Sequence, residues 1–215
     1  MNLNKSILIQ TIDKSKINQI VDIHLLAFPE STLSQFGRKM LARWYEWHME
    51  PPNECYAFGA FDEESMRGFC LAGVFLNSEV YFFRENILFV LWELITHPLL
   101  ILNKKTLERL KNIVLAFYEK LSSRTRKVQK SARPRSEKFG ILSIAVDPVY
   151  QKLGIGRSLV NRVEELAVEK GIKKINISVH PTNVLAVRFY EKNGWQRVCY
   201  DSSKPWQGYM IKVVR

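Results

Sequence analysis

Cysteine and histidine are scarce in this chain of 215 residues, and neither is arranged as metal sites require. The cysteines, Cys55, Cys70 and Cys199, are odd in number and lack metal-type spacing, and the four histidines are scattered. Structural zinc sites use closely spaced cysteine and histidine ligands, so we expect no metal. Disulfide frameworks belong to secreted chains with paired cysteines, so reduced thiols in a cytoplasmic protein are expected.

A hydrophobic run long enough to cross a membrane is also missing. The most apolar segment, residues 80–102, contains Arg84, Glu85 and Glu93 and is broken at Pro98. A spanning helix needs about 20 apolar residues, and each central charge costs about 2.5–3.5 kcal/mol. We therefore predict no spanning helix. The first ten residues have one lysine and too short an apolar run for a signal peptide.

Acidic residues are too few to balance the 32 lysines and arginines, and the net charge is +11. This excess indicates an anionic partner without naming it. Residues 124–138 hold seven basic residues and one acidic residue, together with Ser131, Pro134 and Ser136, so an exposed loop is expected there. Aromatic residues do not interleave with these charges, so base stacking is unsupported and no nucleic-acid partner is predicted.

Apolar runs and helical periodicity alternate along the chain and predict a mixed α/β fold on one sheet. Apolar, β-branched or aromatic runs predict strands at residues 6–12, 55–61, 67–75, 139–146, 173–179, 195–201 and 207–214. Helical spacing predicts helices at residues 13–28, 32–50, 157–170 and 184–193. The acidic turn Asp62–Ser65 predicts that the second and third strands form an antiparallel hairpin.

The order of elements is interrupted at residues 77–138. This insertion contains an aromatic-rich helical stretch, a second helical stretch near Thr106–Leu121 and the basic loop Arg124–Lys138. We expect a single domain over residues 1–215 with the insertion between the third and fourth strands. The aromatic-rich stretch fits a lid packed on the domain. It also fits a peripheral contact of residues 80–138 with an anionic membrane.

A turn with two glycines joins a predicted strand to an amphipathic helix in the segment VDPVYQKLGIGRSLV, residues 146–160. The first N–H groups of a helix lack internal partners and lie at its positive end, and glycines let a phosphate approach them. Gly154 and Gly156, with amides from Leu153 to Ser158, therefore predict a phosphate cradle with Lys152 and Arg157 at its rim. The pair alone fits a tight turn without a ligand equally well.

Two common nucleotide-binding loops are excluded by the residues around these glycines. A P-loop needs a glycine where Gln151 stands and a lysine where Arg157 stands. A dinucleotide fingerprint needs a third glycine where Leu159 stands, and the acidic residue that would bind a ribose is not evident.

The same segment, followed by KINISV and NVLAVRFYEKNGW, resembles the GNAT superfamily of acyl-CoA-dependent N-acyltransferases. Gln151, Gly154 and Gly156 fit that family's Gln/Arg-x-x-Gly-x-Gly/Ala pyrophosphate loop. The family's later helix, with the pattern Asn-x-x-Ala-x-x-x-Tyr-x-x-x-Gly, is matched by Asn183, Ala186, Phe189, Tyr190 and Gly194. The close match covers residues 140–200, and the order of elements in residues 6–76 agrees with it.

The resemblance implies a mostly antiparallel, twisted sheet that splays between its fourth and fifth strands, with helices on both faces. Acetyl-CoA would enter that gap, its pantetheine arm pairing with Ile144–Val146 and its pyrophosphate resting on the amides of residues 152–157. The residues expected to contact it are Ile144, Ala145, Val146, Gln151, Lys152, Leu153, Gly154, Ile155, Gly156, Arg157, Ser158, Asn183 and Tyr190.

The resemblance also implies direct attack by an amine, without an acyl-enzyme. The backbone N–H of Val146 is then the candidate oxyanion donor, and Tyr190 is the candidate general acid for the departing thiolate. A phenol with a pKa near 10 is protonated at neutral pH and can donate. Tyr190 also fits a packing aromatic beside Phe189, and Asn183 fits a plain helix N-cap.

The general base is not evident. Relatives that acetylate protein N-termini carry a glutamate where Ser178 stands. His180 would face the same side of the strand and is the candidate base, because its ordinary pKa near 6.5 suits deprotonating an ammonium. It also fits a loop residue before Pro181. Glu30 and Glu54 are weaker candidates, and an ordered water is a further alternative.

The acceptor is expected to be a small-molecule amine. Long-insert members of the family that this chain resembles look like acyltransferases of bacterial surface-sugar pathways, which implies an amino sugar or a nucleotide-linked sugar. A peptide N-terminus, a polyamine or an antibiotic amine stays open, as does the oligomeric state. A CoA-binding sensor or partner module without catalysis is the alternative function.

Overall fold

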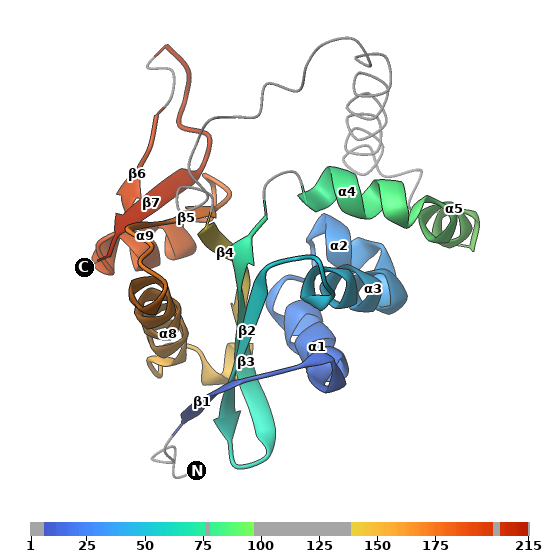
Figure 1. Ribbon diagram of the computed structural model, residues 1–215, viewed down its shortest axis with the longest axis horizontal. Helices are drawn as coiled ribbons and strands as arrows, with labels where there is room; N and C mark the ends of the chain where they lie inside the picture. The colour runs from blue at the N-terminus through green and yellow to red at the C-terminus, as the bar shows by residue number, and fades with distance from the viewer. Residues whose placement is uncertain (1–6, 76–77, 97–138, 200–202, 215) are drawn as a thin grey trace. The chain divides into compact units, whose positions relative to one another are not determined.

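The computed structural model describes residues 7–75, 78–96, 139–199 and 203–214 (Figure 1). The second helical stretch near Thr106–Leu121 and the basic loop lie outside these residues. The chain divides into two compact units, one of residues 1–13, 54–75 and 133–215 and one of residues 14–53 and 76–132. The interpretation as one domain with an insertion stays a prediction.

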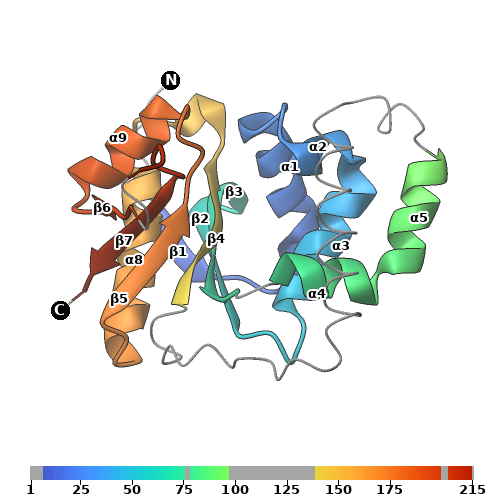
Figure 2. The same ribbon diagram turned by 90° about the horizontal axis from the view of Figure 1, so that it is seen from above.

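The first unit is built on a sheet with the strand order β1-β2-β3-β4-β5-β7-β6 among the described residues (Figure 2). Its strands are β1 (Leu8–Thr11), β2 (Cys55–Asp62), β3 (Ser65–Val74), β4 (Phe139–Val146), β5 (Lys174–Ser178), β6 (Gln196–Arg197) and β7 (Tyr209–Val213). All neighbouring strands are antiparallel except β4 and β5, which are parallel. The predicted mixed, mostly antiparallel sheet is confirmed.

The hairpin of β2 and β3 forms as the sequence predicts. Asp62 pairs with Ser65, so Glu63 and Glu64 make the turn, and Glu63 adopts a left-handed φ of 55°. β3 ends at Val74 and β4 begins at Phe139, 65 residues later.

The parallel pairing of β4 with β5 is short. Only Gly140 with Asn176 and Ile141 with Ile177 are in register. Gly140 has no side chain at the point of closest approach, where a Cβ would lie 2.4 Å from Asn176 Oδ1. Asn176 Nδ2 donates to the carbonyl of Phe139 at 2.7 Å, which ties the two strands together. Beyond Ile141 the ladder to β5 ends within the described residues, and the predicted splay is confirmed.

Helix α8 (Ile155–Glu169) covers the sheet of this unit and contacts β1 to β5. Its predicted apolar face is buried and consists of Leu159, Val160, Val163, Leu166 and Ala167. Gly171, with a φ of 67°, follows its end and lets the chain turn back. Helix α9 (Val184–Lys192) follows β5, and Asn183 caps it by accepting the N–H of Ala186 at 3.1 Å. The N-cap interpretation of Asn183 is confirmed.

The second unit is helical and contains α1 (Ile17–Ala27), α2 (Thr32–Gln35), α3 (Gly37–Met49), α4 (Ser78–Glu85) and α5 (Ile87–Thr96). The prediction of one helix over residues 32–50 is wrong, because Gly37 has a left-handed φ of 85° and separates α2 from α3. The aromatic-rich stretch is helical as expected and forms α4 and α5. The buried Asn86 lies between them and accepts a hydrogen bond from Arg43 Nε at 2.7 Å. No helix among the described residues is long and apolar enough to cross a bilayer.

Candidate functional site

The end of β4 has one strand neighbour within the described residues. Ile144, Ala145 and Val146 pair with Cys70, Phe69 and Gly68 of β3, and none of the three pairs with β5. β4 shifts its register against β3 just before this stretch, between Leu71 and Ala72. The backbone of β4 therefore offers an edge to an extended, amide-bearing chain at the residues that the sequence predicts.

The turn after β4 is held by its own side chains. Asp147 Oδ1 accepts the N–H of Val149 at 3.0 Å and starts a short 3-10 helix, Pro148–Tyr150. Gln151 Nε2 donates back to the carbonyl of Val146 at 3.2 Å. These contacts fix the direction in which the chain leaves β4.

Two residues of this turn are left-handed, Lys152 with a φ of 65° and Gly154 with a φ of 85°. Gly154 is the N-cap of α8 and, having no side chain, makes no capping hydrogen bond. The N–H of Ser158 donates to the carbonyl of Gly154 at 3.0 Å, so that amide is used within the helix. The amides of Ile155, Gly156 and Arg157 precede it at the positive end of the helix.

The positions of Gly154 and Gly156 differ in whether they require glycine. A Cβ on Gly154 would meet nothing within 4 Å, so its left-handed φ, and not crowding, favours glycine there. A Cβ on Gly156 would lie 3.6 Å from the Phe189 ring and 3.9 Å from Val146 Cγ2, which are ordinary contacts. Gly154 therefore shapes the turn, and open space lies in front of it.

The surface of the turn is exposed and basic. Residues 151–154 are exposed, as are Arg157 and Ser158. Neither Lys152 nor Arg157 forms an ion pair with a carboxylate of the described chain. The Ile155 side chain is buried in the core, so this residue offers only its backbone to a ligand. The turn thus combines helix-terminal amides with two cationic side chains, which is the composition of an anion site.

Tyr190 lies in the core on the inner side of α9 and is 4% exposed. Its ring lies 5.1 Å from that of Phe189 and 5.4 Å from that of Trp195. Burial, with a smaller contribution from Cys70, raises the pKa of the Tyr190 hydroxyl above its ordinary value. Cys70 pairs with Ile144, so Tyr190 belongs to the part of the core beneath the edge of β4.

His180 is exposed in the loop after β5. Its Nδ1 lies 2.7 Å from Thr182 Oγ1 and accepts the Thr182 N–H at 3.4 Å. A neutral ring that accepts this N–H has its proton on Nε2. Ser178, where some relatives have glutamate, pairs with Tyr209 of β7. Glu54 accepts a hydrogen bond from Tyr56 at 3.3 Å, and Glu30 belongs to the helical unit.

The sequence analysis did not identify residues 206–208, which contact the chain just after β5. The carbonyl of Gly208 accepts the N–H of Val179 at 2.8 Å, and a Cβ on Gly208 would lie 2.0 Å from Val179 O. Trp206, two residues earlier, donates its Nε1 proton to the carbonyl of Tyr209 at 2.9 Å. The glycine after Trp-Gln was the available signal, but spacing alone does not reveal which distant backbone it meets.

A second missed residue supports the glycine turn from β3. The Arg67 guanidinium lies 4.3 Å from the centroid of the Tyr150 ring. The carbonyl of Arg67 accepts the Asp147 N–H at 2.8 Å. An arginine in a hairpin strand gives no sequence signal for this contact, because the pairing depends on the register of β3 with β4.

Comparison with known proteins decides the family. The model of the acetyltransferase (GNAT) family matches residues 113–195. The matched segment identifies the chain as GNAT-like. This GNAT chain is 33% identical over 55 residues to the ribosomal protein bS18-alanine N-acetyltransferase of Escherichia coli K12, covering 26% of this chain and 37% of that protein. It is 36% identical over 53 residues to the uncharacterized protein YxbD of Bacillus subtilis 168, covering 25% and 33%.

The matched segments span about a third of the length of these curated relatives. Solved structures resemble the GNAT chain over nearly its whole length. PH1933 from Pyrococcus horikoshii OT3 has a TM-score of 0.57 at 18% identity, covering 98% of this chain and 99% of that one. The PaiA N-acetyltransferase of Thermoplasma acidophilum, solved with coenzyme A, has a TM-score of 0.54 at 15% identity, covering 97% and 99%. At these identities the likeness establishes the fold, and the GNAT fold is confirmed.

Proposed function

We propose that this GNAT protein is an acetyl-CoA-dependent N-acetyltransferase that acts on a primary amine by direct attack in a ternary complex. The observation that carries the proposal is the sequence of features along one segment. Within the described residues, the end of β4 that does not pair with β5 leads directly to helix α8. The first amides of this helix have no side-chain cap. A thin amide arm joined to a diphosphate matches both features, and the solved PaiA relative is in complex with coenzyme A.

In the proposed complex the pantetheine arm pairs with Ile144–Val146 as an added strand. The diphosphate contacts the amides from Lys152 to Arg157, and the Lys152 and Arg157 side chains add charge. Asn183 uses its Oδ1 to cap α9, which leaves its amide protons for the pantetheine. Gln151 holds the turn through Val146 and need not touch the ligand.

The proposed reaction forms a C–N bond and breaks the thioester C–S bond. The amine nitrogen attacks the acetyl carbonyl, and the N–H of Val146 stabilises the oxyanion. The bond to sulfur then breaks, the thiolate takes a proton from Tyr190, and the proton lost by the amine restores the phenol. The raised pKa keeps Tyr190 protonated at working pH, although it also makes the phenol a weaker acid.

His180 is the proposed acceptor of the proton on the incoming ammonium, acting through Nδ1 or a bridging water. Nδ1 is the ring atom without a proton, and Thr182 now occupies it. The base role therefore needs the Thr182 contact to be exchanged for substrate or water. Loss of that contact on acceptor binding would give His180 a function only in the ternary complex.

The proposed acceptor is an amino sugar or a nucleotide-linked sugar, in a cytoplasmic setting. The basic rim of the turn and the net charge of +11 favour an acceptor that carries negative charge. The bS18-alanine N-acetyltransferase to which the chain is similar acts on a protein, so a peptide N-terminus is the second acceptor class. A CoA-binding module without catalysis is the alternative function, favoured by Ser178 at the position of the missing glutamate.

Turnover with a panel of amines tests the proposal. Acetyl-CoA is incubated with amino sugars, nucleotide-linked amino sugars, peptides and polyamines, and free thiol release is measured. We expect release with at least one amine, and mass spectrometry should find one added acetyl group on it. Tight CoA binding without thiol release across the panel would favour the non-catalytic module.

A further inference from the structure

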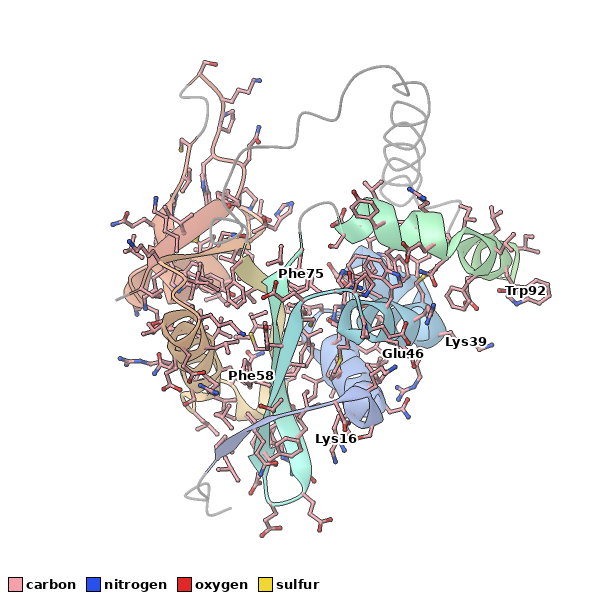
Figure 3. The ribbon with its side chains drawn as sticks, viewed as in Figure 1. Lys16, Lys39, Glu46, Phe58, Phe75 and Trp92 are labelled. Carbon is pink, nitrogen blue, oxygen red and sulfur yellow. The ribbon has the colours of Figure 1, made fainter. Side chains whose placement is uncertain are left out.

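Helix α5 presents an apolar surface that no described residue covers. Five large side chains on it are exposed, with fractions of 80% for Leu88, 62% for Trp92 and 73% for Ile95 and nearly half for Ile87 and Leu91. At about 100° per residue these five fall within an arc of about 140° on one side of the helix. We call them the α5 face. Figure 3 shows Trp92 pointing outward from α5, away from α3 and α4 of the same unit.

The opposite side of α5 anchors the helix. Val90 and Glu93 are each 2% exposed, and Val90 donates its N–H to the carbonyl of Asn86 at 2.9 Å. Glu93 is the only charged residue of α5 and is turned inward. The α5 face therefore contains no charge. The buried residues on the opposite side hold the helix within its unit.

The sequence that follows α5 is strongly positive. Residues 97–138, which follow α5 directly, contain 12 lysines and arginines and 3 acidic residues, a net +9 of the total +11. The rest of the chain is left with +2. An apolar helix face with an exposed tryptophan, followed by a strongly cationic sequence, matches a surface of acyl chains beneath anionic headgroups.

We propose that the α5 face docks on an anionic lipid bilayer and lies in its interface. A helix of ten residues is about 15 Å long, half the thickness of the hydrocarbon core, so it rests on the membrane and does not cross it. Pairing of two copies through this face would associate two chains of net charge +11, which like-charge repulsion opposes. Nucleic acid would be attracted by the charge but would leave the apolar face in water.

This inference is independent of the acetyltransferase proposal, because it uses no residue of the β4 edge or the glycine turn. It assigns the membrane contact of residues 80–138 to one helix and names the side chains that enter the lipid. The buried depth expected for such a helix is about 5–10 Å below the headgroups.

The full chain is tested with vesicles of phosphatidylcholine alone and of phosphatidylcholine mixed with phosphatidylglycerol, by co-sedimentation and by tryptophan emission. We expect binding to the mixed vesicles, weakened by salt, with a blue shift that brominated lipid quenches. The double variant Leu88→Ser, Ile95→Ser should lower the affinity about tenfold or more, because two apolar side chains leave the lipid. Trp92→Phe should keep the affinity and lose much of the blue shift.

Leu26→Ser is the matched control, since Leu26 is also a helical leucine and is 58% exposed, but on α1. It should bind as the unchanged chain does, and circular dichroism should show that all variants fold. Absence of binding to mixed vesicles, equal binding to both vesicle types, or full affinity of the double variant would each overturn the proposal. A dimer that the double variant converts to a monomer would assign the face to a second copy instead.

Discussion

At the scale of single residues, two glycines with positive φ flank helix α8. Gly154 and Gly171 are both left-handed, with φ of 85° and 67°, and a Cβ on either meets nothing within 4 Å. Both positions require a left-handed backbone, but Gly154 precedes α8 and Gly171 follows it. A comparison of alanine variants at the two positions therefore separates the cost of backbone strain from an effect on ligand binding.

We predict that Gly154→Ala and Gly171→Ala each lower the free energy of unfolding by about 1 kcal/mol, because alanine is strained at positive φ. Only Gly154→Ala should also weaken CoA binding, by about tenfold, since strain there re-aims the first amides of α8. Thermal unfolding and isothermal titration with CoA measure the two effects. Equal CoA affinity in both variants would remove the turn from the binding site.

Tyr190→Phe keeps the aromatic ring in the core and removes one hydroxyl. If Tyr190 is the general acid, kcat should fall about a hundredfold while KM for acetyl-CoA changes little. Stability should change by less than about 1 kcal/mol, because the ring contacts with Phe189 and Trp195 remain. Steady-state kinetics at saturating amine gives kcat and KM separately, and an unchanged kcat would leave Tyr190 with its packing role alone.

At the scale of elements, the β4–β5 junction depends on one missing side chain. Gly140→Ala places a Cβ 2.4 Å from Asn176 Oδ1 and 2.5 Å from Asn176 O. We expect a loss of about 1–3 kcal/mol in the free energy of unfolding, as for other overpacked sites. Gly156→Ala is the comparison and should cost less, because its Cβ finds only ordinary contacts. Urea unfolding ranks the two variants, and the reverse order would contradict this account of the junction.

Helices α1 and α3 share a buried histidine that makes their unit sensitive to acid. His24 Nδ1 lies 2.6 Å from Tyr45 Oη and its Nε2 lies 3.2 Å from Ser31 Oγ. Burial lowers the pKa of His24 to about 4 from 6.5. The unfolded chain therefore binds a proton in the range where the folded chain does not.

The stability that neutral His24 supports is present above pH 6.5 and is lost as the pH falls toward 4. His48 follows the same direction, because burial lowers its pKa to about 4. Unfolding free energies measured from pH 7 to pH 4 should decline in this window. His24→Gln should flatten the decline, whereas His180→Gln, at an exposed position, should not alter it.

At the scale of the whole molecule, the sequence predicts helices and strands better than the breaks between them. Strand β4 and helix α9 are found within a residue of their expected bounds, because apolar periodicity and an N-cap are local signals. The division at Gly37 was missed, since a glycine inside a periodic stretch does not by itself reveal a left-handed φ.

The candidate site divides in the same way. Gly154 and Asn183 were predicted from motifs because their roles depend on neighbours in the chain. The contacts of Gly208 with Val179 and of Arg67 with Tyr150 join segments far apart in the sequence. Only the strand register brings these residues together, and no local pattern encodes it.

Binding of CoA should raise the stability of the folded chain. CoA that binds only the folded state stabilises it by about 2.7 kcal/mol at a hundred times its dissociation constant. We predict a rise in the melting temperature that grows with CoA concentration and is reduced in Gly154→Ala. Differential scanning fluorimetry checks this, with adenosine as a control that lacks the diphosphate. A melting temperature indifferent to CoA would contradict the proposed donor.

The amide bridge from Asn176 to Phe139 sets the vertex from which two neighbouring strands diverge. The side chain of Asn176 and the absence of a side chain at Gly140 thereby fix the point at which the two strands begin to separate. If the proposed donor enters between these strands, variation in the surrounding loops can change which amine is accepted without moving the donor.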